Sequence, residues 1–125
     1  MQPTVLIADD TSFMRFVLRE LLDEIPLVRI AEAGSLEEAE DLATALSPDL
    51  AVVDTTTEKF DGCELIRRLV VGDHSPRVVA IIGIDDLAAE LAAKAAGAEA
   101  VMICPFDPDV VLTIMENMLQ PAMPV

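Results

Sequence analysis

Three aspartates stand where the chain leaves two apolar segments, and their positions suggest chemistry. Asp9 and Asp10 directly follow the apolar run of residues 4–8, and Asp54 directly follows the apolar run of residues 50–53. Apolar runs of this length are typical of strands buried in a parallel sheet. Because the binding crevice of such a sheet lies at the carboxyl ends of its strands, we expect the three side chains to converge there.

Carboxylates brought together in a crevice repel one another, and a divalent cation removes that cost. Carboxylate and carbonyl oxygens with open water positions suit magnesium. A carboxylate beside bound magnesium can also attack phosphorus, because the cation offsets the charge of the incoming phosphoryl group. The alternative is that one or two of these acids only cap loops or the following helix. We favour the cation site, because Asp54 is distant in sequence from Asp9 and Asp10 yet also stands at a strand end.

These strand ends belong to a regular alternation of strand-like and helix-like segments. Apolar runs predict strands at residues 4–8, 28–32, 50–53, 78–82 and 100–103. Helical spacing and stop signals predict helices at residues 12–25, 36–46, 63–71, 85–96 and 107–119. Five such units predict a parallel sheet with helices on both faces, joined by right-handed crossovers.

The first predicted helix has clear start and stop signals. We expect Ser12 to cap it and Pro26 to end it. Its apolar positions recur at helical spacing, and they are Phe13, Val17, Leu21 and Ile25. Because one face of this helix must be buried, we expect one of Phe13 and Phe16 to be partly exposed and packing to be the main role of both. Gly97 is the expected stop of the fourth helix.

Length and composition place the chain in one compact domain. It has 125 residues, of which 53% are hydrophobic, enough to fill a single core. We assign residues 1–120 to this domain and residues 121–125 to a tail or the start of a linker. No apolar run approaches the roughly 20 residues of a membrane-spanning helix, and the N-terminus leads into a strand without a secretory leader. We therefore expect a cytoplasmic protein with no membrane partner.

The charge balance limits the kinds of partner. Eight basic residues stand against 23 acidic ones, which gives a formal net charge of −15. Such a surface repels phosphate backbones, so we expect no direct nucleic-acid binding and charged partners that present basic patches. Cys63 and Cys104 lack the spacing of a zinc site and are expected to be free thiols.

Several motifs occur together in the order and spacing of a known family. Residues 5–10 read as its first strand and acidic pair, and residues 48–54 read as the strand that ends in its phosphoacceptor. The Asp61-Gly62 turn, Ala96-Gly97-Ala98 and Pro105-Phe106 complete the pattern. Over nearly its whole length, the chain therefore resembles the CheY-like receiver domains of response regulators in two-component signalling.

The resemblance implies a flavodoxin-like (βα)5 fold with a doubly wound sheet of five parallel strands in the order 2-1-3-4-5. It implies that Asp54 is the phosphoacceptor and that Asp9 and Asp10 hold Mg²⁺ with the Asp54 carboxylate and the backbone carbonyl of Thr56. It also implies a cis peptide bond before Pro105, because proline is the one residue at which a cis bond costs little.

Three positions depart from the family pattern. Where the family has a serine or threonine at the end of the fourth strand, this chain has Ile82. Where the family has a lysine before the proline, the chain has Cys104, and where it has an aromatic residue in the fifth strand, the chain has Val101. All three family residues sense the phosphoryl group or transmit its presence, so we expect phosphate sensing to be impaired.

The loop after Asp54 offers possible substitutes for these residues. Residues 55–57 are three threonines, which can supply a hydroxyl, and Lys59 can supply a cation. We expect instead that the hydroxyls satisfy backbone groups of the loop and that Lys59 lies in water, as charged loop side chains usually do.

The sequence admits three functions. The first is a receiver domain that takes a phosphoryl group from a sensor histidine kinase or phosphotransfer protein and signals to an output protein or domain, with a homodimer possible. The second is a phosphorylation-independent pseudo-receiver that acts as an interaction module. The third, a phosphotransferase or phosphatase that uses an aspartyl phosphate, fits poorly because Thr56 stands where such enzymes have a second acid. We expect no enzyme activity beyond self-catalysed phosphotransfer to Asp54.

Overall fold

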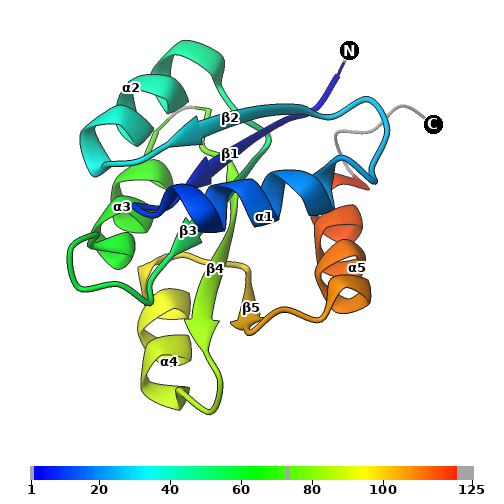
Figure 1. The fold of residues 1–125 in the computed structure, drawn as a ribbon. Helices are drawn as coiled ribbons and strands as arrows, with labels where there is room; N and C mark the ends of the chain where they lie inside the picture. The colour runs from blue at the N-terminus through cyan, green and yellow to red at the C-terminus, as the bar shows by residue number, and fades with distance from the viewer. Residues whose placement is uncertain (1, 73, 121–125) are drawn as a thin grey trace.

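The computed structural model of the chain describes residues 2–72 and 74–120, so the predicted tail at residues 121–125 lies outside it. In these ranges strands and helices alternate along the chain (Figure 1). The strands are β1 (Thr4–Ala8), β2 (Arg29–Ala33), β3 (Leu50–Asp54), β4 (Arg77–Gly83) and β5 (Ala100–Cys104). The helices are α1 (Ser12–Leu22), α2 (Leu36–Leu46), α3 (Gly62–Leu69), α4 (Leu87–Ala96) and α5 (Pro108–Leu119).

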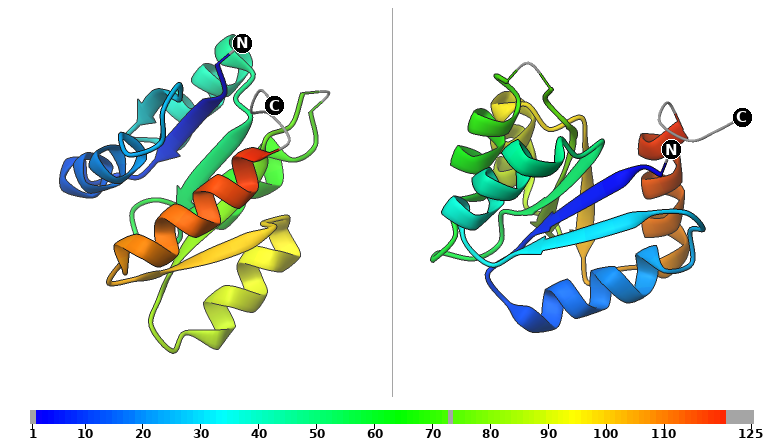
Figure 2. Two further views of the ribbon diagram at one scale, coloured as in Figure 1. Left: turned by 90° about the vertical axis from the view of Figure 1, so that its right-hand side faces the viewer. Right: turned by 90° about the horizontal axis from the view of Figure 1, so that it is seen from above.

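The strands form one parallel sheet in the order β2-β1-β3-β4-β5, as the sequence predicted. Helices α1 and α5 cover one face, and α2, α3 and α4 cover the other (Figure 2). The central strand β3 is buried along its whole length, because both of its faces are covered and both of its edges are paired. This double burial explains why its sequence is a continuous apolar run rather than an alternating one.

The strand order reverses between β1 and β3, and this reversal creates the crevice that the acids occupy. The chain continues from β1 to β2 on one side and from β3 to β4 on the other, so the connections leave in opposite directions. The register places Ala8 opposite Val53. The next residues, Asp9 and Asp54, therefore leave neighbouring strands at the same level, at the switch point where ligands bind in sheets of this kind.

Helix α1 differs from its prediction at both ends. Its N-cap is Thr11 rather than Ser12, and the Thr11 side chain makes no capping hydrogen bond. That hydroxyl instead donates to the carboxylate of Asp9, which removes it from the helix end. The helix ends at Leu22, four residues before Pro26, so the proline lies in the following turn rather than at the helix terminus.

The buried face of α1 also differs from its prediction. Leu18, Leu22 and the predicted Ile25 are buried in the core, and the predicted Leu21 packs partly buried against it. Phe13 and Phe16 are 73% and 57% exposed, so the expectation that only one of them would be partly exposed was wrong. Both lie in the first half of α1, ahead of the residues that pack against the sheet.

The other elements begin and end within two residues of the predicted positions. Gly97 ends α4 with φ of 128°, a conformation that a residue with a Cβ rarely adopts. In the part of the chain that the structure describes, no helix is long and apolar enough to span a membrane.

Candidate functional site

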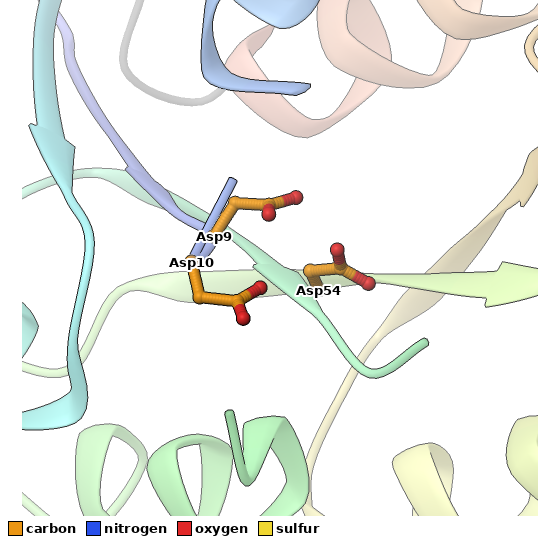
Figure 3. A group of neighbouring side chains, drawn as sticks. All are labelled: Asp9, Asp10 and Asp54. Atoms are coloured by element: carbon orange, nitrogen blue, oxygen red, sulfur yellow. The ribbon is translucent and has the colours of Figure 1, made fainter. Parts of the chain in front are cut away.

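The three aspartates converge at the carboxyl edge of the sheet. Asp9 and Asp10 follow β1 and Asp54 ends β3, and their side chains gather in one place (Figure 3). One carboxylate oxygen from each lies within 4.8 Å of those from the other two. Asp9 and Asp54 are buried, and Asp10 is half-buried. The predicted convergence is therefore present.

Asp9 and Asp54 are each held by the residue two positions further along the chain. Oδ1 of Asp9 accepts hydrogen bonds from the backbone N–H and the hydroxyl of Thr11, at 2.9 and 3.0 Å. Oδ1 of Asp54 accepts hydrogen bonds from the backbone N–H and the hydroxyl of Thr56, at 2.7 and 2.6 Å. Each of these two carboxylates is thus held through its Oδ1, and neither threonine binds its Oδ2.

The remaining oxygens fit a divalent cation. Oδ2 of Asp9, Oδ1 of Asp10 and Oδ2 of Asp54 are buried and have no hydrogen-bond partner among the described residues. A buried carboxylate oxygen without a partner is costly, so three together call for a positive charge. An all-oxygen set of this kind suits Mg²⁺ better than a softer metal.

No described lysine or arginine makes an ion pair with these three carboxylates. Arg15 comes near, but its guanidinium donates to the backbone carbonyl of Asp9 at 2.7 Å and pairs with Glu32 at 3.4 Å. The cluster thus lacks a protein cation of its own.

The electrostatic cost appears in the titration of Asp9. Burial, and after it the adjacent carboxyl of Asp54, raise the pKa of Asp9 from 3.8 to about 7, although the hydrogen bonds from Thr11 act to lower it. When the pKa of an acid is higher in the folded protein than in the unfolded chain, ionisation of that acid lowers the stability of the folded protein. The contribution of Asp9 to folding therefore becomes less favourable as the pH rises from about 4 to about 7.

Gly62 lies directly against the backbone of Asp54. A Cβ built on Gly62 would overlap the backbone carbonyl oxygen of Asp54 and lie 3.0 Å from its carbonyl carbon. Asp61 precedes it as the N-cap of α3 and accepts from the N–H of Glu64 at 3.0 Å. The Asp61-Gly62 turn is thus an N-cap followed by a glycine that lets α3 approach the end of β3. The sequence identified the turn as a family motif but not this close approach.

Of the three positions that depart from the family pattern, two lie at this end of the sheet, and Val101 lies near the start of β5. Ile82 is 2% exposed and pairs with Ile103 in the sheet. Val101 is half-buried against the core that α2, α3 and α4 cover. Cys104 pairs with Gly83 and precedes a cis peptide bond to Pro105.

Cys104 lies close enough to Asp54 and Asp9 for their charges to act on its thiol. Burial raises the pKa of its thiol, and the negative charges of Asp54 and Asp9 raise it further. The side chain is therefore a neutral thiol at ordinary pH. It supplies no positive charge to the cluster.

The loop after Asp54 follows one prediction and contradicts another. The hydroxyl of Thr55 donates to the backbone carbonyl of Ile81 at 2.7 Å, as expected for a loop threonine. The hydroxyl of Thr56 does not serve the backbone but binds the Asp54 carboxylate, and the hydroxyl of Thr57 is buried without a hydrogen-bond partner among the described residues, so the expectation was wrong for both. Lys59 is exposed, in agreement with its prediction. The spacing of Thr56, two residues after an aspartate, matches that of Thr11 after Asp9 and was the signal available in the sequence.

The model of the response regulator receiver domain family matches residues 5–116 of the chain. The chain belongs to this family. As a receiver domain of a two-component response regulator, it retains the acidic pocket formed by Asp9, Asp10 and Asp54.

Two curated relatives of the receiver domain show the extent of the match. Protein CcdB of Bacillus subtilis is 30% identical over 115 residues, 92% of this chain and 96% of that protein. The chemotaxis protein CheY of Thermotoga maritima is 26% identical over 113 residues, 90% of this chain and 94% of that protein. The similarity thus spans nearly the full length of both proteins.

Solved structures resemble this receiver domain closely. The response regulator receiver protein from Burkholderia phymatum has a TM-score of 0.81 and 28% identity, covering 99% of this chain and 100% of that chain. A putative response regulator from Chloroflexus aurantiacus has a TM-score of 0.88 at 24% identity, covering 96% of this chain and 99% of that one. The flavodoxin-like fold with strand order 2-1-3-4-5 is therefore confirmed.

The first prediction concerns the close approach at Gly62. We expect Gly62→Ala to lower the free energy of unfolding by about 2–3 kcal/mol, because backbone rather than a flexible side chain obstructs the added methyl group. Urea unfolding followed by circular dichroism measures this change. Gly83→Ala is the matched control, because a Cβ there meets nothing within 4 Å. Equal effects of the two substitutions would contradict the steric argument.

The second prediction concerns the repulsion at Asp9. Asp9→Asn keeps an oxygen for the donors of Thr11 and removes the charge that burial disfavours. Without divalent cations, we expect the variant to be more stable than the wild type above about pH 7, by an amount on the order of 2–4 kcal/mol.

This difference should shrink as the pH falls toward 4, where both forms are neutral in the folded state. Thermal unfolding in a chelating buffer across this pH range measures it. Asp41→Asn, an exposed acid on α2, is the control and should change little. A less stable Asp9→Asn at high pH would show that the Asp9 charge stabilises the metal-free protein.

Proposed function

We propose that this receiver domain works as a phosphoacceptor in which Asp54 takes a phosphoryl group from a sensor histidine kinase or a phosphotransfer protein. The observation that carries the proposal is Oδ2 of Asp54, a buried carboxylate oxygen without a hydrogen-bond partner beside two further aspartates. Such an oxygen is a competent nucleophile once its charge repulsion is offset. It forms a bond to phosphorus while the bond from phosphorus to the donor atom breaks, and the donor leaves with that electron pair.

In this proposal Asp9, Asp10 and Asp54 hold Mg²⁺ together with the backbone carbonyl of Thr56. The three unpartnered oxygens support the carboxylate part of this set. When bound, the cation lowers the repulsion between the acids and the incoming phosphoryl group. The chain's own residues orient the nucleophile, since Thr56 holds Oδ1 of Asp54 and leaves Oδ2 free.

We further propose that phosphorylation is slow or structurally quiet. The thiol of Cys104 is neutral where the family has a lysine ammonium, and Ile82 offers no hydroxyl for a phosphoryl oxygen. A charge-assisted hydrogen bond contributes roughly 1.5–3 kcal/mol, so its loss slows the reaction by roughly ten- to a hundredfold. A conformational change needs contacts that differ between two states. Because Ile82 and Val101 replace the hydroxyl and the aromatic residue that make such contacts in the family, a phosphoryl group on Asp54 would do little to stabilise a second conformation.

The second candidate function is a pseudo-receiver that binds partners without phosphorylation. The same three departures favour it, because a domain that does not respond to phosphate has no need of the lysine, hydroxyl and aromatic residue. In either role the partners include an output protein or domain. Several expectations stay predictions from the sequence. They are the cytoplasmic location, a possible homodimer, the domain boundary at residues 1–120, and the absence of enzyme activity, of membrane binding and of direct nucleic-acid binding.

The hydrogen bonds of Thr56 determine which oxygen of Asp54 can react. A carboxylate oxygen has two lone pairs, and the N–H and hydroxyl of Thr56 together use both lone pairs of Asp54 Oδ1. Oδ2 is then the one oxygen that can meet both a cation and phosphorus. Releasing the hydroxyl bond frees a lone pair on Oδ1 for the cation and leaves Oδ2 to attack phosphorus, so in this proposal the bond that orients Oδ2 also slows phosphorylation.

The third prediction tests the phosphoacceptor and its impairment together. With Mg²⁺ and acetyl phosphate, the wild type should gain the mass of one phosphoryl group, and Asp54→Asn should gain none. Cys104→Lys should react roughly tenfold faster, because it restores a positive charge beside the pocket. Cys104→Met, which has a similar length but no charge, should not. Intact-mass spectrometry over time measures the rates.

Two outcomes would contradict parts of this proposal. Rapid and complete phosphorylation of the wild type would contradict the proposal that phosphorylation is impaired. Failure of both the wild type and Cys104→Lys to react, with both folded by circular dichroism, would remove the phosphoacceptor role and leave the interaction module.

The fourth prediction concerns the Thr56 hydroxyl. Thr56→Val keeps the shape of the side chain and the backbone N–H but removes the hydroxyl from Asp54 Oδ1. We expect phosphorylation to become faster, by roughly tenfold at most, because one hydrogen bond to the ionised group no longer has to be released. Thr55→Val is the matched control, since that hydroxyl binds a backbone carbonyl instead. A slower Thr56→Val would mean that the hydroxyl orients the nucleophile productively.

A further inference from the structure

Arg15 lies beside the acidic cluster without pairing with any of its carboxylates. Its Nη1 donates a hydrogen bond to the backbone carbonyl oxygen of Asp9 at 2.7 Å, and its Nε lies 3.4 Å from a carboxylate oxygen of Glu32. The side chain is only 21% exposed. Because Arg15 lies six positions after Asp9, its side chain joins the first half of α1 to the end of β1.

The surroundings of Arg15 hold its guanidinium in one place. Glu32 pairs with Arg15 through one oxygen and with Arg19 through the other, at 2.7 Å, so it is itself held between two arginines. Gly34 leaves room for the group, since a Cβ built there would lie 3.1 Å from Nη1 of Arg15. A guanidinium is a planar fork with donors in fixed directions, so these contacts give it a single orientation.

The carbonyl that Arg15 holds belongs to the peptide bond between two of the acids. Asp9 and Asp10 are neighbours at this point of the chain (Figure 3). The N–H of Asp9 donates to the carbonyl of Ala33 at 3.0 Å, so the backbone of Asp9 is held on both sides. Because a peptide unit is planar, fixing this carbonyl also fixes the N–H and the Cα of Asp10. Arg15 thereby determines the direction in which the Asp10 side chain leaves the backbone.

Asp10 depends on its backbone more than the other two acids do. Thr11 donates two hydrogen bonds to Oδ1 of Asp9, and Thr56 donates two to Oδ1 of Asp54. Oδ1 of Asp10 is buried and has no hydrogen-bond partner among the described residues. The direction of the Asp10 carboxylate therefore follows from the peptide that carries it.

We propose that Arg15 is a positioning residue of the cation site, which keeps the Asp10 carboxylate in the cluster by holding the carbonyl of Asp9. The inference rests on the cation site of the proposed function, and it does not require phosphorylation of Asp54. Groups that orient metal ligands without binding the metal change metal affinity by roughly ten- to a hundredfold when they are removed.

The charge of Arg15 gives the test a clear direction. A positive charge near the site repels a cation, so loss of that charge alone should tighten binding. Loss of the hold on the Asp9 carbonyl should weaken binding instead, because the Asp10 carboxylate no longer keeps one orientation. Weaker binding after removal of Arg15 therefore reports positioning and cannot result from the change of charge.

The probe is Mg²⁺ alone, titrated into the 125-residue chain labelled with ¹⁵N, and the shifts of amide resonances around the cluster give its dissociation constant. Arg15→Met should bind Mg²⁺ roughly tenfold more weakly than the wild type. Arg19→Met is the matched control, because it removes the same charge from the same carboxylate of Glu32. It should stay within about twofold of the wild type, since the guanidinium of Arg19 binds Glu32 and not the Asp9 carbonyl.

A conservative variant and a stability measurement complete the test. Arg15→Lys keeps the charge but has one amine in place of the fork, so its affinity should lie between those of the wild type and Arg15→Met. It also keeps the inference testable if Arg15→Met fails to fold, which circular dichroism shows. A purely structural role for Arg15 would lower the free energy of unfolding in a chelating buffer and leave the Mg²⁺ dissociation constant of the folded protein unchanged.

The outcomes separate this inference from the function on which it rests. Unchanged or tighter Mg²⁺ binding by both Arg15 variants, with binding by the wild type intact, would overturn the inference and leave the phosphoacceptor role standing. Equal weakening by Arg15→Met and Arg19→Met would also overturn it, because the bond to the Asp9 carbonyl would not be the cause. Failure of the wild type to bind Mg²⁺ would overturn the cation site itself, and the inference with it.

Discussion

The mutual repulsion of three carboxylates at one edge of the sheet is the interaction on which the rest of the site depends. The parallel register carries Asp9 and Asp54 to the same level on neighbouring strands, and Asp10 lies beside them. Burial then removes the water that would otherwise screen them, which raises the pKa of Asp9 to about 7. A folded chain accepts such a cost where a ligand removes it, and here the unpartnered oxygens fit a divalent cation.

The surrounding residues hold this arrangement without neutralising it. Thr11 and Thr56 each donate two hydrogen bonds to one oxygen of an aspartate, and each leaves the other oxygen without a partner. Gly62 lets the start of α3 approach the end of β3 closely. Cys104 lies nearby but contributes no charge, since its thiol stays protonated. The pocket thus offers oxygens that fit a cation, while Ile82 and Cys104 supply neither a hydroxyl nor a positive charge.

Much of the fold followed from local patterns. A strand that is buried on both faces has a continuous apolar sequence, as β3 does, and Gly97, with φ of 128°, marks the end of a helix. Both features can be recognised in the sequence without tertiary information. The face of α1 was harder to predict, because Phe13 and Leu18 both fit a helical stripe. Which of them is buried depends on how far α1 extends along the sheet, and that is decided by packing rather than by periodicity. The N-cap of α1 was missed for a similar reason, because the Thr11 hydroxyl binds Asp9 instead.

The sequence by itself determined that acids end two neighbouring strands, that the chain alternates strand and helix five times, and that a thiol and an isoleucine replace polar family residues. Each of these is a matter of residue type and spacing, which one-dimensional patterns record. Only the tertiary structure decided which oxygens of the acids are free and that the Thr56 hydroxyl binds Asp54. The free oxygens depend on distances between strands that are far apart in the chain, which packing alone sets, and the Thr56 bond depends on how the loop after β3 folds against the end of that strand.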